Sequence, residues 1–490
     1  MMNSPHTTSE KSDLGRIGRS TSTMFTFRLL SQGVTFITLV VLAQALGPHD
    51  YGQYSYILGF LVFFTLVVSF GINEIVIRDA SASPAERLGF LSSGLFLKVV
   101  FTSLATIMAG AGFFIIDLPL ELRGYALLSC LMLITSYSFH SFRTYLEIPF
   151  QIDYRMELPS AIFLVVRTLF LIFIIVGLHQ GVTIGYAIIT GLVSETAGLL
   201  LLIFLARRRD YLPRPSWDRE KFTYIIKQSW PVAIAGTFIM VYTKIDILFL
   251  QWLRNSTEVG YYAVSMRLVD ALAIVPTVFM TAALPLFSRS FREDVGLFFR
   301  RVRLSFRLLL AVILPIVGVI AFYSVEVIRL LYGEDYAPSA AALQILIFAE
   351  IFVYGGLVFD NSLVACGKQR FTGLLAALMA LSNIILNLIF IPQYGIAGAA
   401  WATVVSYGLG LTIAVFIPTI RGQSLSFWRE FFIPLAIAIG LGGIAKALHF
   451  PLAAACLLTA GGFYSALHFT GILRIAHVRQ MVKIITNRQE

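Results

Sequence analysis

Residues 228–253 read QSWPVAIAGTFIMVYTKIDILFLQWL, and residues 260–288 read GYYAVSMRLVDALAIVPTVFMTAALPLFS. Each segment is long and apolar enough to cross a bilayer, and the short connection makes the two a helical hairpin. Together they carry four charged side chains near mid-membrane depth: Lys244, Asp246, Arg267 and Asp270. Charges at that depth are costly, so they face a bundle interior or a hydrated cavity. The hairpin therefore predicts a polytopic membrane protein with a functional path nearby.

Composition extends this prediction to the whole chain. Of its 490 residues, 58% are hydrophobic and only 13% are charged, far from the balance of a soluble globular protein. Apolar runs predict an all-α protein with about 14 transmembrane helices. They lie near residues 22–46, 52–72, 88–116, 119–141, 158–178, 182–206, 228–253, 260–288, 302–323, 338–366, 371–391, 395–418, 428–448 and 451–473. The two shortest turns fall to Pro392–Gly395 and Phe450–Pro451.

Basic residues predict the orientation. Most of the 37 Lys and Arg residues, Arg143 among them, fall in alternate connections, so by the positive-inside rule these connections and both termini are cytoplasmic. The net charge of +10 is spread over these loops, which predicts attraction to anionic membrane lipids rather than a nucleic-acid partner. Five cations remain within predicted spans: Arg28, Lys98, Arg167, Lys244 and Arg267.

A repeated turn predicts two lobes. Asp50-Tyr-Gly-Gln-Tyr-Ser55 follows the first span, and Glu258-Val-Gly-Tyr-Tyr-Ala263 follows the seventh. This spacing favours duplication of a six-span unit, and an even number of spans makes the repeat parallel. Chance similarity of interfacial turns is the alternative explanation. The expected organisation is a tail 1–21, an N-lobe 22–206, a linker 207–227, a C-lobe 228–420, two additional spans in 421–473 and a tail 474–490.

The charges within spans admit two interpretations. Arg167 has no acid within helical reach and is the best candidate for an unpaired cavity cation, whereas Arg267 can pair with Asp270 at i, i+3. Arg28, and similarly Lys98, can either snorkel to the inner interface or line a cytoplasmic mouth. The alternative to a substrate-binding cavity is a structural salt-bridge network that locks the charged hairpin.

Acids and prolines add candidates for ion coupling and movement. Glu195 and Glu350 stand alone near mid-membrane, where each is either protonated and inert or a proton or sodium site. Asp246 and Asp270 are further candidates for coupling or charge pairing. Pro276 follows Asp270 closely, so this span can bend beside the charges.

Enzymatic signatures are absent from the sequence. It has no Gly-rich loop ending in Lys-Ser/Thr, no His-Glu-x-x-His and no Gly-x-Ser-x-Gly. Its three cysteines, scattered within spans, have neither disulfide nor metal-ligand spacing. We therefore expect a transporter rather than an enzyme, with no cofactor and no metal.

Several segments in register carry a family resemblance: Ala45–Tyr54, Trp230–Pro231, Tyr242–Asp246, Glu258–Tyr262, Arg267–Asp270, Pro276, Leu330–Pro338, Asn383–Asn387 and Ile391–Ala399. In these segments the chain resembles the polysaccharide flippases that export lipid-linked O-antigen and exopolysaccharide repeat units. These belong to a superfamily that includes multidrug-and-toxin extrusion antiporters and murein-lipid flippases. The resemblance covers most of the chain and is specific for the family, though not for a substrate.

The resemblance implies two six-helix lobes around a central lumen, alternating access and a cationic cavity that receives a lipid pyrophosphate. The five cations within spans carry over as candidates for that cavity. Implied partners are a lipid-linked oligosaccharide, membrane lipids, a coupling proton or sodium ion, and polysaccharide polymerase and chain-length proteins. The implied location is the bacterial cytoplasmic (inner) membrane. Alternatives are a cation-coupled small-molecule exporter, a membrane glycosyltransferase or polymerase, and a scaffold subunit of a secretion complex.

Overall fold

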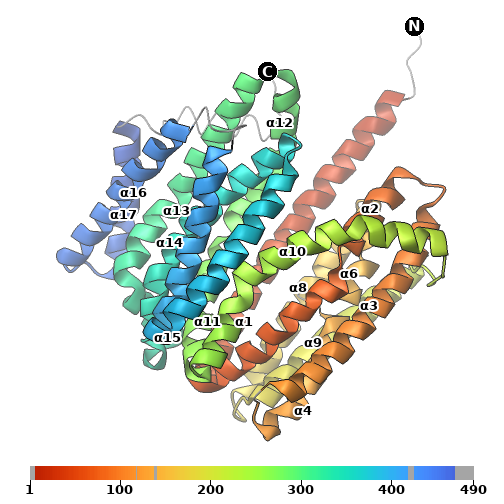
Figure 1. Ribbon diagram of the computed structural model, residues 1–490, viewed down its shortest axis with the longest axis horizontal. Helices are drawn as coiled ribbons and strands as arrows, with labels where there is room; N and C mark the ends of the chain where they lie inside the picture. Colours follow the sequence, from red (N-terminus) through yellow and green to blue (C-terminus); the bar gives the residue numbers. More distant parts are fainter. Residues whose placement is uncertain (1–5, 117, 137–140, 418–423, 470–490) are drawn as a thin grey trace. The chain divides into compact units, whose positions relative to one another are not determined.

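The computed structural model describes residues 6–116, 118–136, 141–417 and 424–469, with side chains from residue 23 onward except at 424–429. The predicted tail 474–490 lies outside the described residues. Every regular element within the described ranges is helical, which confirms the all-α fold class (Figure 1). Eleven of the described helices are long and apolar enough to cross a membrane. The number 14 stays a prediction.

The chain divides into two compact units, Met1–Thr237 (unit 1) and Phe238–Glu490 (unit 2). Helices that begin in unit 1 are α1 (His6–Ser69), α2 (Ile72–Ala82), α3 (Arg87–Ile115), α4 (Leu120–Ser129), α5 (Met132–Thr135), α6 (Phe142–Leu146), α7 (Ile148–Ile152), α8 (Glu157–Gly177), α9 (Ile184–Arg208) and α10 (Arg219–Leu253), which ends in unit 2. Those of unit 2 are α11 (Ser256–Leu272), α12 (Ile274–Glu293), α13 (Val295–Tyr332), the short 3₁₀ helix η2 (Glu334–Tyr336), α14 (Ser339–Ala365), α15 (Gln369–Phe416), α16 (Ser424–Ala447) and α17 (Leu452–Phe469).

Two of the longest helices contain a break where a turn between spans is predicted. The backbone of α1 leaves helical geometry at Gly47, with φ of 72°, directly before Pro48. The backbone of α15 does so at Gly395, with φ of 55°, shortly after Pro392. A left-handed backbone is accessible to Gly at little cost, and Pro withholds the N–H that a continuous helix would need. Each of these two helices therefore contains two predicted spans.

The segment predicted as a continuous span over 119–141 is instead interrupted, which corrects that prediction. After α4 and the single turn of α5, Ser136 adopts an extended backbone with ψ of 134°. The next helix, α6, begins after Ser141, whose side chain accepts a hydrogen bond of 3.2 Å from the Arg143 backbone N–H. Ser and Thr side chains compete for backbone groups and favour such ends, which apolar length alone does not reveal.

A second interruption lies in the span that carries Asp270, where α11 ends and α12 begins around Ala273. Pro276 cannot donate to the carbonyl of Leu272 four residues earlier. The hydroxyl of Tyr354 on α14 donates to that carbonyl at 2.8 Å, so the missing hydrogen bond is replaced. The predicted bend near Pro276 is confirmed.

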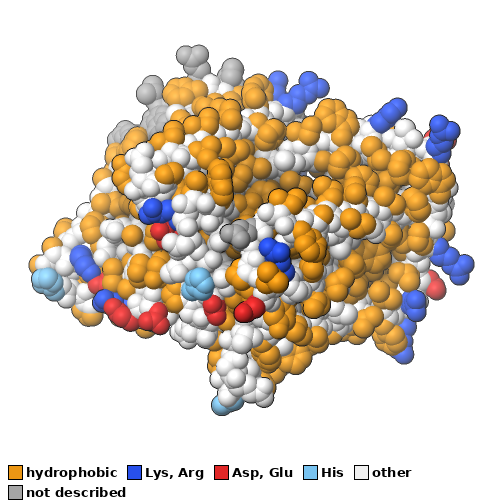
Figure 2. Space-filling model, turned by 60° about the horizontal axis from the view of Figure 1, so that its bottom comes forward, with side chains coloured by type: hydrophobic (Ala, Val, Ile, Leu, Met, Phe, Trp, Pro, Cys, Tyr) orange, Lys and Arg blue, Asp and Glu red, His pale blue; other side chains and the backbone are white. Residues whose placement is uncertain are grey.

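Hydrophobic side chains dominate the face that Figure 2 shows, while Lys, Arg, Asp and Glu occur in small separate groups. Exposed large hydrophobic residues include Ile107, Ile115 and Leu200, each more than 60% exposed. Soluble monomers rarely expose apolar surface on this scale, whereas a bilayer accepts it.

Candidate functional site

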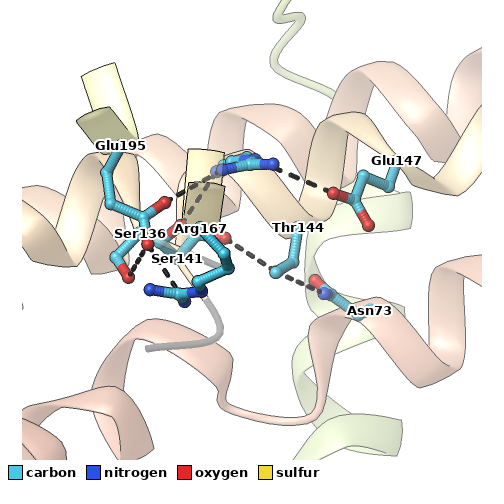
Figure 3. A network of polar contacts seen from close by, with 8 residues as sticks. Asn73, Ser136, Ser141, Thr144, Glu147, Arg167 and Glu195 are labelled. Carbon is cyan, nitrogen blue, oxygen red and sulfur yellow. Dashed lines mark hydrogen bonds and ion pairs between the residues drawn. The ribbon is translucent and has the colours of Figure 1, made fainter. Parts of the chain in front are cut away.

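The carboxylate of Glu195, in the middle of α9, is the centre of a buried charge network in unit 1 (Figure 3). Arg143 Nη1 lies 2.9 Å from Glu195 Oε2, and Arg167 Nη2 lies 3.1 Å from Glu195 Oε1. The Ser136 hydroxyl donates to Glu195 Oε1 at 3.1 Å. Arg143 comes from α6, Arg167 from α8 and Ser136 from the end of α5. Ser136 and Arg143 flank the interruption of the fourth predicted span, and both contact Glu195. We call Ser136, Arg143, Glu147, Arg167 and Glu195 the Glu195 cluster.

Glu147, at the junction of α6 and α7, extends the cluster. Arg143 Nε lies 3.8 Å from Glu147 Oε1, and Arg28 of α1 also acts electrostatically on this carboxylate. Two guanidinium groups thus form ion pairs with the carboxylates of the cluster, and the charge of a third, that of Arg28, acts on Glu147. The side chain of Arg143 is fully buried and that of Arg167 is 13% exposed, so these charges depend on one another rather than on water.

Two predictions about this region are wrong. Arg167 is not an unpaired cation, and Glu195 is not a lone acid, because they form an ion pair with each other. Glu195 lies on α9, the helix that follows α8, so it is not an i, i+4 neighbour of Arg167. Arg167 additionally lies over the ring of Phe163 at 4.7 Å.

Ser136, Arg143 and Glu147 are the cluster members that sequence patterns did not predict. Arg143 was predicted to be a cytoplasmic loop residue, yet its guanidinium is fully buried against an acid in the middle of α9. The available signal was the sequence Ser141-Phe-Arg143 followed by Glu147 at i, i+4, which suits a short capped helix with an internal ion pair.

A second buried carboxylate, Asp246 of α10, is held by neutral donors in unit 2. Its oxygens accept hydrogen bonds from the Tyr262 hydroxyl at 2.5 Å, from Asn387 Nδ2 at 2.6 Å and from the Thr403 hydroxyl at 2.7 Å. Asn387 also donates to Asn383 Oδ1 at 3.0 Å. Asp246 is only 1% exposed. We call these five residues the Asp246 cluster; only Asp246 was predicted as a site residue.

Lys244 and Asp270 form the ion pair of the charged hairpin. Lys244 Nζ lies 3.0 Å from Asp270 Oδ2, and the two side chains are 32% and 41% exposed. Lys244 and Asp246, two residues apart on α10, thus have different partners. Asp270 pairs with Lys244, and Arg267 also takes part in an interaction. The pairing of Arg267 with Asp270 stays a prediction.

A cavity of about 240 Å³ in unit 2 is lined by carboxylates. Asp270, Glu350 and Asp360 all border it, together with the aromatic rings of Tyr242 and Tyr407. Contributing residues come from α10, α11, α12, α14 and α15.

Other predicted site residues lie apart from these groups. Lys98 of α3 is fully buried, and the carboxylate of Glu74 acts on it electrostatically. Within the described ranges, no group of three or more His, Cys, Asp or Glu side chains has the arrangement of a metal site.

Comparisons with known proteins assign the chain to a family. The model of the family described as "Polysaccharide biosynthesis protein" matches residues 17–291, and that of "Lipid II flippase MurJ" matches residues 156–467. The chain is similar to the capsular polysaccharide biosynthesis protein CapF of Staphylococcus aureus, with 19% identity over 79% of this chain and 96% of that protein. It is also similar to the probable low-salt glycan biosynthesis flippase Agl15 of Haloferax volcanii, with 22% identity over 81% and 82%.

Among solved structures, the fold is similar to that of a lipid II flippase MurJ in an inward closed conformation. The TM-score is 0.74, with 15% sequence identity over 92% of this chain and 99% of that one. At this identity the similarity concerns the fold.

Proposed function

The chain belongs to the polysaccharide biosynthesis protein family, and we propose from this membership that it is a flippase for lipid-linked oligosaccharides. The family match over residues 17–291, which include Arg28, Arg167 and Glu195, carries the proposal. An oligosaccharide head group cannot enter the apolar layer unaided, because its polar groups would lose their hydrogen bonds to water. A protein that surrounds this head group with polar and charged side chains removes that penalty.

The proposed substrate is a polyprenyl-pyrophosphate-linked repeat unit of a surface polysaccharide. A pyrophosphate is anionic, and guanidinium groups bind phosphate oxygens in a bidentate geometry that an ammonium group cannot match. Arg143 and Arg167 belong to the Glu195 cluster, and Arg28 acts electrostatically on Glu147 within it, so these arginines are the favoured anion-binding groups of unit 1. Lys244 is a weaker candidate because its ammonium group lacks the bidentate geometry of a guanidinium group.

Transport would proceed by alternating access, with the prenyl tail remaining in lipid. A proton or sodium gradient is the proposed energy source, acting at Glu195, Glu350 or Asp246. Burial of these three carboxylates supports the assignment, since each is at most 4% exposed and its charge state therefore matters energetically.

The proposed location is a bacterial cytoplasmic membrane with both termini inside, where polysaccharide polymerase and chain-length proteins would take the product. The basic connections of the chain support this orientation. The protein acts as a transporter in this proposal and makes or breaks no covalent bond.

A reconstitution experiment tests the proposal. Purified protein in proteoliposomes should expose a polyprenyl-pyrophosphate-linked oligosaccharide, loaded on one leaflet, to an impermeant glycosidase on the other side. Deletion of the gene should abolish surface polysaccharide and leave lipid-linked units on the inner leaflet. Retained surface polysaccharide together with no flipping in vesicles would overturn the proposal.

Arg28→Gln tests the cationic path, with Arg28→Lys as the charge-retaining control. Loss of one anion contact should slow flipping about tenfold, which corresponds to roughly 1.4 kcal/mol. The Lys variant should retain more activity than the Gln variant at equal protein levels in the membrane. Equal activities of both variants and the parent protein would remove Arg28 from the path.

A further inference from the structure

Glu350 is a buried acid of unit 2 and one of the three candidates for ion coupling in the proposed transport. It lies on α14, is 3% exposed and borders the cavity of about 240 Å³. Its Oε2 atom has no hydrogen-bond partner among the described residues. A buried carboxylate oxygen without a hydrogen-bond partner is costly, and a bound cation or proton would relieve that cost.

The charges around the cavity favour a ligand with one positive charge, bound at the Glu350 carboxylate. Asp270, which interacts electrostatically with Glu350, is already paired with Lys244 at 3.0 Å. Asp360 is the third carboxylate of the lining, and it lies ten residues further along α14, about 15 Å away along the helix axis. One small ligand therefore meets Glu350 without also contacting Asp360.

The lining favours an organic cation over a metal ion. Divalent metal ions such as Mg²⁺ or Ca²⁺ require several oxygen ligands, and the described residues contain no group of three or more His, Cys, Asp or Glu side chains that could hold one. The cavity is instead bordered by Tyr242, Tyr407 and Phe352, and the two tyrosine rings meet edge to face at 5.3 Å. Aromatic faces attract ammonium groups.

The size of the cavity fits the same class of ligand. An apolar cavity of about 150 Å³ accommodates benzene. A volume of about 240 Å³ therefore accommodates an aromatic ring together with a substituted ammonium group.

We propose that this cavity binds a small organic cation, with its ammonium group at Glu350 and its apolar part against Tyr242, Tyr407 and Phe352. The inference goes beyond the proposed glycan transport and does not depend on it. A protein that binds the cation without flipping glycans would overturn the proposed function and leave this inference intact.

Equilibrium binding of trimethylphenylammonium to the purified full-length protein tests the proposal. Isothermal titration calorimetry at constant pH should detect binding of this cation and none of benzenesulfonate, an anion of similar size. Glu350→Gln should weaken binding about tenfold or more. Glu334→Gln, which removes an exposed acid of the same unit outside the cavity lining, should leave binding unchanged.

Two results would overturn the proposal: no binding to the parent protein, or equal binding to the Glu350→Gln variant. If that variant does not fold, the parent protein decides the question. A hydrophobic carbodiimide should label Glu350, and saturating trimethylphenylammonium should protect it, as mapped by peptide mass spectrometry. Labelling of Glu350 that the cation does not reduce would equally overturn the proposal.

Discussion

Glu195 forms ion pairs with two arginines of unit 1, Arg143 and Arg167. Replacing it with Gln keeps the size of the side chain but leaves Arg143, which is fully buried, with only Glu147 at 3.8 Å. Breaking a buried ion pair by removing one partner costs about 3–5 kcal/mol. We expect Glu195→Gln to lower the free energy of unfolding by that amount, measured by thermal unfolding in detergent. Glu121→Gln, at an exposed acid of α4, is the matched control and should change stability by less than about 0.5 kcal/mol.

Asp246 depends on neutral donors, and Tyr262 supplies the shortest of its hydrogen bonds, at 2.5 Å. Tyr262→Phe removes this donor and should destabilise the protein by about 1–3 kcal/mol, because a buried carboxylate loses a partner. Tyr261→Phe is the control on the same helix, since the Tyr261 ring packs edge to face on Tyr336. Equal stability of the Tyr262→Phe variant and the parent protein would show that Asp246 does not require this donor.

Residue patterns identified Asp246, Glu195 and Arg167 but not the other members of the two clusters. Charges within apolar runs are visible in a sequence, which is why Asp246 and Glu195 were selected. Their partners Arg143, Asn387 and Thr403 lie far away along the chain, and Asn and Thr are too common in membrane helices to attract notice. Residue spacing within one helix predicts contacts on that helix only, whereas these partners are brought together by the packing of different helices.

Tyr354 replaces the hydrogen bond that Pro276 removes between α11 and α12. Tyr354→Phe should leave the Leu272 carbonyl without that donor and lower stability by about 1 kcal/mol. Pro276→Ala restores a local N–H donor, so the double variant should recover part of the loss. A double-mutant cycle on thermal unfolding measures this coupling. Additive effects of the two substitutions would contradict it.

Helix boundaries agree with the sequence-based predictions where Gly or Pro marks a turn. The breaks at Gly47 and Gly395 and the bend before Pro276 coincide with predicted turns or hinges. The interruption after Thr135 lies within the predicted span 119–141, because residues 136–141 contain no Pro or Gly to mark a turn. Ser136 and Arg143, on either side of the interruption, both bind Glu195.

The stability of the whole molecule at acidic pH should depend on the ion pair between Arg87, at the start of α3, and Asp153, at the end of α7 in unit 1. Burial alone would raise the pKa of Asp153, but hydrogen bonds from Tyr211 and Arg87 outweigh it and hold that pKa below its usual value. The Arg87–Asp153 distance is 2.9 Å. A lowered pKa stabilises the fold above the pKa of the unfolded carboxyl, about 3.9, and this contribution is lost as pH falls through the folded value.

Asp153→Asn removes the titrating group and tests this prediction. Thermal unfolding measured from neutral pH downward should show that the parent protein exceeds the variant in stability near pH 7, and that the difference narrows below about pH 4. A constant difference across that range would mean that ionisation of Asp153 does not contribute.

Glu350 and Tyr354 lie one helical turn apart on α14, so they point from the same face of that helix. One of them borders the cavity, and the other holds the Leu272 carbonyl at the bend between α11 and α12. Straightening of that bend would pull on the side chain directly beside the buried acid. A movement at the bend would therefore reach the cavity through a single turn of α14, the turn that carries Glu350 and Tyr354.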